Sequence, residues 1–295
     1  MSDTLVNLQR RKKSAGDLAA VVRTMKAMAM SNITQYEVAV ESLQEYYRTI
    51  SLGLCACFKK EKVSLATANY NKRNSISVAV IFGSDQGLVG RFNDLIYMHA
   101  QQILKEISGE IEVWAVGERV HSLLLDEGLT PTRYFSVPNS IAAITPLVNQ
   151  ILINSEQYRK GEQDYNFYIF HNKPTQGAHY QQENRQLFPP DKQWKEEITQ
   201  MEWPTQKLPQ VIGKVESTMR TLIREYLFVS LYKASAESLA AENASRLESM
   251  ERAEKNIEEV LEELNMGYNR LRQSTIDGEL FDVIAGFEAL KKQDE

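Results

Sequence analysis

The stretch RLESMERAEKNIEEVLEELNMGYNRLRQST occupies residues 246–275, and its spacing decides the fold. Residues recur at steps of three and four along a seam made of Leu247, Met250, Glu254, Ile257, Leu261, Leu264, Tyr268, Leu271 and Thr275. Such alternating steps line up on one side of a helix, which is the heptad spacing of a coiled coil. Because no proline follows Pro209, the pattern predicts one helix over about 211–287. That helix is on the order of 115 Å long at ~1.5 Å per residue.

A matching seam lies near the N-terminus. It consists of Leu18, Val22, Met25, Ala29, Asn32, Tyr36, Ala39, Leu43, Tyr46 and Ile50, with Asn32 as its strongly polar member. The first proline is Pro131, so nothing breaks this helix before about residue 58. Two long helices that can each bury the other's seam predict an antiparallel coiled coil. The alternative is a bundle of separate helical hairpins. The unbroken pattern of the C-terminal segment disfavours it, because the chain has no place there to fold back.

In the middle of the chain the heptad spacing ends, and short β-branched runs typical of strands replace it. Predicted strands cover 75–82, 110–117, 132–137 and 164–172, with a fifth inside 179–188, and predicted helices cover 94–107, 118–127 and about 140–160. Alternating strands and helices indicate parallel pairing, and the last two strands form a hairpin because no helix separates them. The predicted fold class is therefore α/β: an antiparallel coiled coil of long N- and C-terminal helices with an inserted Rossmann-like α/β domain. The expected boundaries are 1–58 for the first helix, 75–188 for the α/β domain and 210–290 for the last helix, with a polar link at 59–74.

The composition indicates an ordered chain with its own core. Of the 295 residues, 43% are apolar and 25% are charged, and the net charge is −5. An acidic chain has no overall attraction to nucleic acid, so we expect no nucleic-acid partner. No apolar run reaches the ~20 residues of a membrane span. The start MSDTLVNLQR lacks the features of a signal or import peptide, so a mature chain beginning near Met1 in a cytosol-like compartment is expected.

One segment, FGSDQGLVGRFND at residues 82–94, has the position of a ligand loop, since it follows a predicted strand and precedes a helix. Its glycines, Gly83, Gly87 and Gly90, lack the G-x-G-x-x-G spacing, and Asp85 would repel a phosphate. A strand–helix turn that needs the backbone freedom of glycine is therefore favoured over a nucleotide site.

No catalytic, cofactor-binding or metal-binding residue is predicted. Cys55 and Cys57 have no ligand cluster around them, which favours two buried or half-buried residues. Most glutamates of the last helix, Glu237 and Glu242 among them, are expected to solvate its outer face. The histidines lie in different elements without metal-ligand spacing, which favours packing or surface roles: His99, His121, His171 and His179.

Three segments resemble the γ subunit of F-type ATP synthases, the central rotor shaft. Residues 241–290 contain the family-like motifs ENASRLESM, YNRLRQ and GELFDVIAG. Residues 84–93 (SDQGLVGRFN) and 23–31 (RTMKAMAMS) are similar to two further motifs of that family. The resemblance implies a non-catalytic subunit without a cofactor. Its expected role is to transmit the rotation of a membrane ring to a catalytic hexamer, so that ion flow is coupled to ATP synthesis or hydrolysis.

The resemblance also implies partners and contact residues. The partners would be the catalytic and non-catalytic subunits of the hexamer, an ε-type stalk subunit and the membrane rotor ring. The chain would lie peripherally on the cytoplasmic side of the plasma membrane, without inserting into it. Contacts with the hexamer would be made by Met25, Arg272, Gln273, Asp277, Glu279 and Phe287, with Met25 against the same zone as Arg272, and residues 283–290 as an apolar bearing. Asp277, Asn32 and Phe287 depart from the family's usual threonine, lysine and small residue.

Two other classes of protein remain open at this point. The first is a nucleotide-binding Rossmann-type enzyme with coiled-coil arms that uses the loop at 83–94. The second is a coiled-coil adaptor unrelated to energy conversion.

Overall fold

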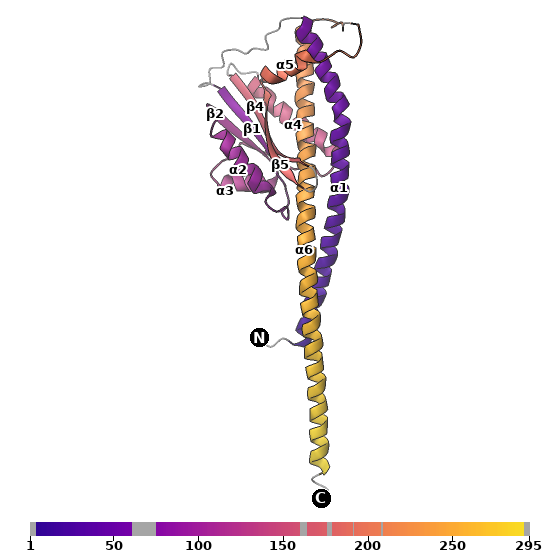
Figure 1. The fold of residues 1–295 in the computed structure, drawn as a ribbon. Coiled ribbons are helices and arrows are strands. Elements are labelled where there is room, and N and C mark those ends of the chain that lie inside the picture. The colour runs from indigo at the N-terminus through magenta and orange to yellow at the C-terminus, as the bar shows by residue number, and fades with distance from the viewer. Residues whose placement is uncertain are drawn as a thin grey trace. The chain divides into compact units, whose positions relative to one another are not determined.

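The computed structural model describes residues 4–60, 75–159, 164–175, 179–190, 192–207 and 209–291, without the side chains of residues 60, 159, 164, 192, 193 and 286–291. The predicted link at 59–74 therefore lies largely outside the described residues. In chain order the elements are α1 (Leu5–Lys60), β1 (Ser75–Phe82), α2 (Phe92–Leu104), β2 (Glu110–Val116), α3 (Glu118–Asp126), β3 (Arg133–Phe135), α4 (Ile141–Arg159), β4 (Asp164–Pro174), β5 (Tyr180–Phe188), α5 (Lys192–Gln200) and α6 (Val215–Lys291) (Figure 1).

The chain divides into two compact units. One, called here the terminal helix pair, combines residues 1–28 with 248–295, and the other, called the sheet unit, covers residues 29–247. Helices α1 and α6 each contribute to both units. Helix α6 begins at Val215 and not at the expected residue 211, because Gly213 at φ 86° interrupts the helical conformation just before it. The domain boundaries expected from the sequence stay a prediction.

The sheet has the order β3-β2-β1-β4-β5. Strand β1 pairs in parallel with β2 and β4, and β2 pairs in parallel with β3, because helices provide the crossovers. Strand β5 pairs with β4 in the antiparallel direction, as expected for two strands joined without a helix. The predicted fold class, a coiled coil of terminal helices with an inserted α/β domain, is confirmed.

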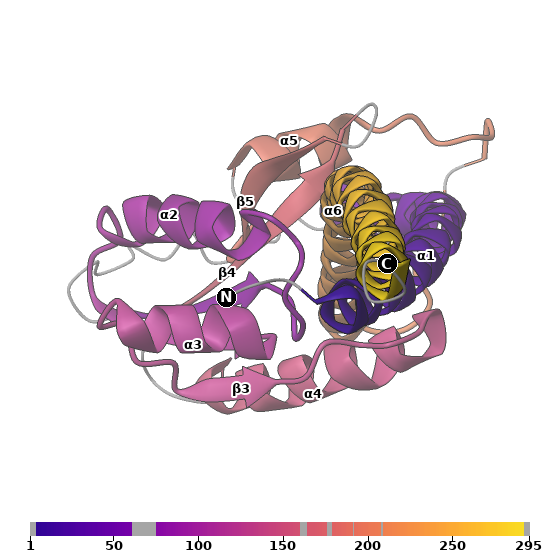
Figure 2. The same cartoon turned by 90° about the horizontal axis from the view of Figure 1, so that it is seen from below.

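Each face of the sheet carries its own hydrophobic core, because successive side chains of a strand point to opposite faces. Val78 and Val80 of β1 pack with residues of α1, α4 and α6. Ala79 and Ile81 pack with residues of α2 and α3 on the other face. Figure 2 shows α2 and α3 together on the side of the sheet away from α6. Cys55 and Cys57 are buried in the first core and are not joined in a disulfide.

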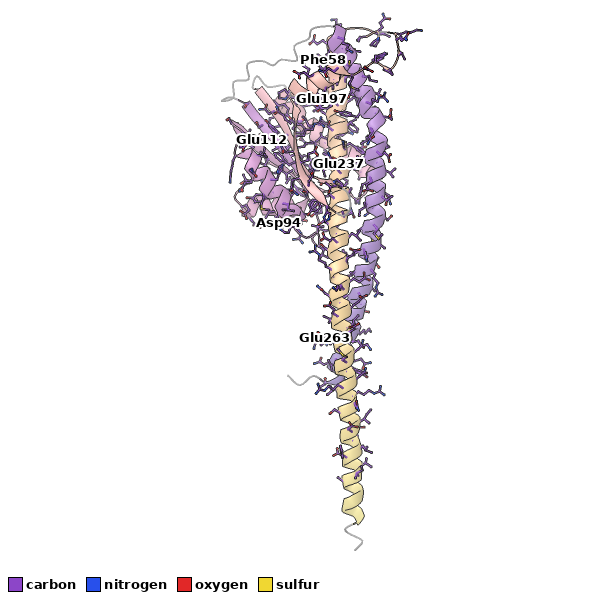
Figure 3. All side chains as sticks on the ribbon, viewed as in Figure 1. Phe58, Asp94, Glu112, Glu197, Glu237 and Glu263 are labelled. Carbon is purple, nitrogen blue, oxygen red and sulfur yellow. The ribbon has the colours of Figure 1, made fainter. Side chains whose placement is uncertain are left out.

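The stretch of α6 that faces the sheet is buried almost all round. Residues 234–245 (ASAESLAAENAS) are all buried, and their small side chains allow the sheet and helix α1 to approach closely. Asn32 of α1 donates a 3.3 Å hydrogen bond to Asn243 here, so the polar member of the seam has a polar partner. Glu237 and Glu242 lie inside this stretch, where Figure 3 shows Glu237 beside the sheet, so the expectation that they solvate an outer face is wrong.

Most positions of the two heptad seams are buried or half-buried, with one correction in α6, where Thr275 is exposed, and two in α1. Leu18 is exposed and its neighbour Ala19 is buried instead. Tyr46 is also exposed, and its hydroxyl donates a 2.7 Å hydrogen bond to Glu225, whereas Tyr47 packs against the ring of Tyr226. Heptad spacing alone does not say on which flank of a seam the partner helix lies, and a tyrosine at the edge keeps its hydroxyl near polar groups.

Candidate functional site

The terminal helix pair brings residues 5–28 of α1 against α6 from residue 248 onward. Its core is narrow: Leu8, Ala19 and Val22 of α1 are buried, as are Met250 and Leu264 of α6. Small and branched side chains of this kind fit the alternating knobs and holes of a two-helix seam.

A cluster of charges shows the register of the two helices. The Arg23 Nε donates to Glu254 Oε1 at 2.9 Å, and the Lys26 Nζ donates to Glu254 Oε2 at 3.2 Å. Further ion pairs join Lys26 to Glu251 at 3.5 Å and Arg23 to Glu258 at 3.7 Å. The hydrogen bond from Arg23 is the largest cause that lowers the pKa of Glu254, and the bond to Glu254 is the largest cause that raises the pKa of Lys26. These antiparallel cross-helix pairs show which turns of α1 and α6 lie side by side.

That register places Met25 far from the other predicted contact residues. Met25 is half-buried and stands next to Lys26, level with Glu254. Arg272 lies 18 residues further along α6, which is ~27 Å at ~1.5 Å per residue. The expectation that Met25 lies against the same zone as Arg272 and Gln273 is therefore wrong for the chain by itself, although the role of each residue in a contact stays a prediction.

The last turns of α6 are exposed on every side. Every side chain from Arg272 to residue 285 is exposed, which includes Gln273, Asp277 and Glu279. None of Arg272, Asp277 and Glu279 makes an ion pair with a described residue. Phe287 lies in the helix, and its side chain is outside the described residues.

These exposed turns also carry large apolar side chains, of which the sequence reasoning singled out only those within residues 283–290. They are Ile276, Leu280, Phe281, Val283 and Ile284, and Phe281 and Val283 are 69% and 70% exposed. A monomeric soluble protein rarely leaves such a group of apolar side chains in water, which makes this end of α6 a candidate surface for a partner. The signal was present in the sequence, because Ile276, Leu280 and Ile284 recur every four residues beyond the last half-buried seam position, Leu271.

The loop at 83–93 serves to hold elements together. The Asp85 carboxylate accepts hydrogen bonds from the backbone N–H of Glu118, at 2.9 Å, and of Val137, at 3.0 Å. The N-terminus of α3, where a phosphate would bind, is thus already occupied by an anion. Helix α2, which also begins at this loop, has Asp94 in its first turn. Both charges disfavour a nucleotide phosphate here.

Two glycines of this loop are required for different physical reasons, and only one of the reasons was expected. Gly83 does not have a positive φ, but a Cβ on it would lie 2.4 Å from the Cβ of Val120. It is required for close packing of β1 against α3, which corrects the expectation of backbone freedom at that position. Gly90 at φ 54° does use that freedom, next to Leu88 at φ 62°.

The structure also brings together a buried pair that the sequence did not reveal. His171 of β4 and Glu237 of α6 are 66 residues apart, and His171 Nε2 lies 2.8 Å from Glu237 Oε2. Both side chains are buried. No sequence pattern could find this pair, because the two residues stand on a strand and a helix that only the tertiary fold places together.

The part of the chain that the structure describes shows neither a metal-ligand cluster nor a membrane-spanning helix. No cluster of three or more histidine, cysteine or acidic residues there could hold a metal ion. Of the described helices, none has a stretch apolar enough and long enough to span a bilayer. Two antiparallel helices that continue into an exposed, partly apolar end, with a tightly packed α/β insertion, define a coiled-coil shaft subunit of a larger assembly.

The chain belongs to the ATP synthase family, whose family model matches residues 4–290. It is 24% identical to the ATP synthase gamma chain of Clostridium acetobutylicum over 97% of this chain and 98% of that one. It is 25% identical to the gamma chain of Geobacter metallireducens over 98% of this chain and 99% of that one.

Solved structures share the fold. One neighbour is a chain of the Euglena gracilis mitochondrial ATP synthase OSCP/F1/c-ring in rotational state 3, with a TM-score of 0.65 and 14% identity over 99% of this chain and 96% of that one. Another comes from the central stalk and c-ring of the Tetrahymena thermophila mitochondrial enzyme, with a TM-score of 0.56 and 17% identity over 79% of this chain and 99% of that one.

The family match and the relatives confirm the resemblance expected from the sequence. The γ chain is the non-catalytic central-stalk rotor subunit of its complex and a peripheral one, so the prediction that this chain has no enzymatic activity of its own is confirmed. The readings as a Rossmann-type enzyme or an unrelated adaptor are set aside.

Proposed function

We propose that this chain is the turning shaft of a bacterial F-type ATP synthase, on the cytoplasmic face of the plasma membrane. In this proposal, rotation of a membrane ring driven by ion flow turns the shaft, and the shaft turns inside a hexamer of catalytic and non-catalytic subunits. An ε-type stalk subunit is the further partner. The observation that carries the proposal is the exposed end of α6, where Ile276, Leu280, Phe281, Val283 and Ile284 have no covering helix.

A shaft can change the affinity of a catalytic subunit only if it contacts that subunit differently in each orientation, because only a difference in interaction free energy shifts a conformational equilibrium. The end of α6 has the asymmetry this requires. Ile276, Leu280 and Ile284 interleave with Gln273, Asp277 and Phe281 on one face of the helix. The opposite face carries small and polar residues: Ser274, Thr275, Gly278 and Asp282. One face therefore offers mostly apolar contacts with a few polar groups, and the opposite face offers only small and polar ones.

Within this function we assign Arg272 and Gln273 as polar holds on the catalytic subunits, with Asp277 and Glu279 in the same contact zone. An exposed guanidinium and an exposed amide are suited to hydrogen bonds that form and break as the shaft turns. Residues 283–290, with Phe287, form the apolar bearing. Met25 would meet a different part of the hexamer, since it stands ~18 residues away along the shaft.

The experiment that tests this function is reconstitution. We expect the isolated chain to have no ATPase activity, and we expect the hexamer to show sustained multiple-turnover hydrolysis only after the chain is added. The control is the chain truncated after Leu271, which keeps both buried seams but lacks the exposed end of α6. Full activation by the truncated chain, or no activation by the intact one, would contradict the proposal.

A further inference from the structure

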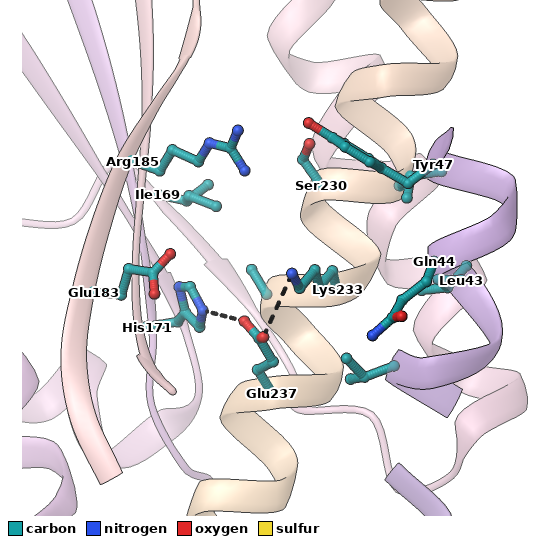
Figure 4. A pocket seen from close by; sticks show the side chains of 13 residues that line it. Leu43, Gln44, Tyr47, Ile169, His171, Glu183, Arg185, Ser230, Lys233 and Glu237 are labelled. Carbon is teal, nitrogen blue, oxygen red and sulfur yellow. Dashed lines mark hydrogen bonds and ion pairs between the residues drawn. The ribbon is translucent and has the colours of Figure 1, made fainter. Parts of the chain in front are cut away.

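The last turns of α6 lack the contacts that hold the rest of the helix. Earlier in α6, Glu237 lies 2.8 Å from His171 of β4 and 3.8 Å from Lys233, so the sheet helps to fix those turns (Figure 4). From Arg272 to residue 285, by contrast, every side chain is exposed, and Figure 1 shows α6 continuing there without α1 beside it. These turns must therefore be stable as a single helix in water, or they must acquire their stability elsewhere.

The composition of these turns does not favour a single helix. Most of the stability of helices in proteins comes from the packing of one face, and a short helix in water is marginal. Residues 272–285 read RQSTIDGELFDVIA, in which serine, threonine, aspartate and β-branched residues, all weak helix formers, are frequent. Gly278 stands in the middle, and glycine inside a helix favours the unfolded form by about fivefold relative to alanine.

Polar side chains add little support to these turns. Four of them are charged: Arg272, Asp277, Glu279 and Asp282. None of the four makes an ion pair with a described residue, whereas Arg252 pairs with Glu248 one turn away at 3.4 Å in an earlier part of the helix. The Thr275 hydroxyl donates a 2.9 Å hydrogen bond to the carbonyl of Leu271, and a bond of this kind slightly destabilises a helix.

The apolar side chains of the same turns can supply the missing stability only when they are covered. Ile276, Leu280 and Ile284 recur every four residues on one face, and Phe281 beside them is 69% exposed. Burial of such a face against a partner contributes the packing that a marginal helix needs. The helical form of residues 272–285 is therefore favoured by whatever covers this face.

We propose that residues 272–285 interconvert between helix and coil in the isolated chain and become a lasting helix only when a partner covers their apolar face. The structure shows the helical form of this segment. The inference rests on the proposed function, in which the covering partner is the catalytic hexamer. Folding on binding lowers the affinity, because part of the interaction free energy is used to order the segment. A flexible end can also enter a closed ring of subunits before the helix forms inside it.

Hydrogen exchange of the intact chain, followed by mass spectrometry, tests the flexible state directly. We expect the amides of residues 273–285 to exchange about a hundredfold faster than those of residues 253–265, and binding to the hexamer to slow them by about the same factor. Equal protection of both segments in the isolated chain overturns the inference and leaves the proposed function standing. Fast exchange that persists in an active reconstituted complex also overturns it, whereas failure of the proposed function shows itself as absent activation of hydrolysis.

A substitution that stabilises the helix separates folding on binding from the binding of a preformed helix. A Cβ on Gly278 would meet nothing within 4 Å, so Gly278→Ala raises the helical population without strain in the chain. We expect it to slow exchange at residues 273–285 and to tighten binding to the hexamer by about fivefold. Gly267→Ala is the matched control. Its Cβ would also meet nothing within 4 Å, but Gly267 is half-buried where the helix is already held, so binding should stay within about twofold.

Ser274→Ala guards against a clash between the methyl group added at Gly278 and the hexamer, because alanine is smaller than serine. Serine is also the weaker helix former, so we expect this variant to bind the hexamer about twofold more tightly than the parent chain. Titration of labelled hexamer with each variant measures the affinities. Unchanged or weaker binding in both Gly278→Ala and Ser274→Ala would show that the helix is formed before binding, and would overturn the inference.

Discussion

The Ser245 hydroxyl of α6 donates a 2.6 Å hydrogen bond to the backbone carbonyl of Val89, 156 residues earlier in the chain. This bond joins the loop after β1 directly to the long helix, where Val89 also packs on Ala241. Both motifs that resemble the γ family, SDQGLVGRFN and ENASRLESM, therefore meet at one point of the sheet unit. Their shared purpose is to fasten the α/β insertion to the helix that would carry torque.

Removal of this bond should weaken the folded state measurably. We expect Ser245→Ala to lower the free energy of unfolding by ~1–3 kcal/mol, because the buried Val89 carbonyl loses its side-chain donor. Urea denaturation monitored by circular dichroism measures the change. Thr221→Ala is the control, since that exposed hydroxyl bonds only to its own helix, at Ser217, and its loss should stay within ~0.5 kcal/mol. Equal losses of unfolding free energy in the two variants would refute the role of the Ser245 bond in holding the loop to α6.

Gly83 should tolerate no side chain. A Cβ at this position meets the Cβ of Val120 at 2.4 Å, so Gly83→Ala forces β1 and α3 apart, with an expected cost of ~1–3 kcal/mol. Gly87→Ala in the same loop is the comparison, because its Cβ would meet Arg119 at an ordinary 3.6 Å. Thermal unfolding of both variants measures the difference. A Gly83→Ala protein as stable as the Gly87→Ala protein would contradict the close packing of Gly83 against Val120.

Gln273 should matter to coupling and not to the stability of the chain. If it bonds a catalytic subunit, Gln273→Ala leaves a desolvated partner group unpaired at a cost of ~1–3 kcal/mol. The complex reconstituted in membranes should then transport fewer ions for each ATP that it hydrolyses. Glu258→Ala is the control, since an exposed ion pair such as the one with Arg23 contributes at most about 1 kcal/mol. Negligible effects of both variants would remove Gln273 from the contact.

A substitution at the exposed apolar end of α6 should affect activation of ATP hydrolysis in the complex but not the stability of the isolated chain. Phe281→Ser should change the free energy of unfolding of the isolated chain by less than ~0.5 kcal/mol, because the ring is 69% exposed. In the reconstituted complex the same change should lower activation of hydrolysis, because up to ~3 kcal/mol of burial against a partner is lost. Ile153→Ser, at an equally exposed position on α4, should alter neither quantity. Undiminished activation by Phe281→Ser would show that this surface is not buried in the complex.

The charge cluster at Glu254 predicts an acid-sensitive terminal helix pair. Its folded pKa lies below the ordinary 4.5, chiefly through the hydrogen bond from Arg23, so its contribution is present above about pH 4.5 and is lost as the pH falls through the lower folded value. Lys26 has the opposite sign: its pKa is raised above 10.5, so its contribution is lost only as the pH rises through that higher value.

Glu254→Gln should therefore reduce the loss of stability between neutral pH and about pH 3, and molar salt should do the same because the groups are exposed to solvent. Chemical denaturation at a series of pH values measures the effect. Glu262→Gln, an exposed glutamate on the same helix, should retain the full acid dependence of the parent chain. An identical pH profile for Glu254→Gln and the parent would contradict the role of the cluster.

Part of the candidate contact surface, made of Met25 and the exposed end of α6, could be predicted from sequence and part could not. Arg272, Gln273, Asp277 and Glu279 were selected by resemblance, and the structure places all four on one exposed segment of α6. The position of Met25 relative to them depends on the register between the helices, which the contacts of Arg23 and Lys26 with Glu254 show and the heptad spacing alone does not give. The apolar residues around Phe281 had a regular spacing, but only the structure shows that nothing in the described chain covers them.

The sequence by itself determined the class of fold. Heptad seams, β-branched runs and the positions of glycine and proline are local properties, and local periodicity is enough to separate coiled-coil helices from an α/β insertion. The tertiary structure alone decided which distant groups meet: Ser245 with Val89, Asp85 with the N-terminus of α3, and His171 with Glu237. Such contacts depend on the distance between elements in space, which periodicity does not encode. Whether a glutamate of α6 faces water or a buried histidine is therefore settled only when the sheet packs against the helix.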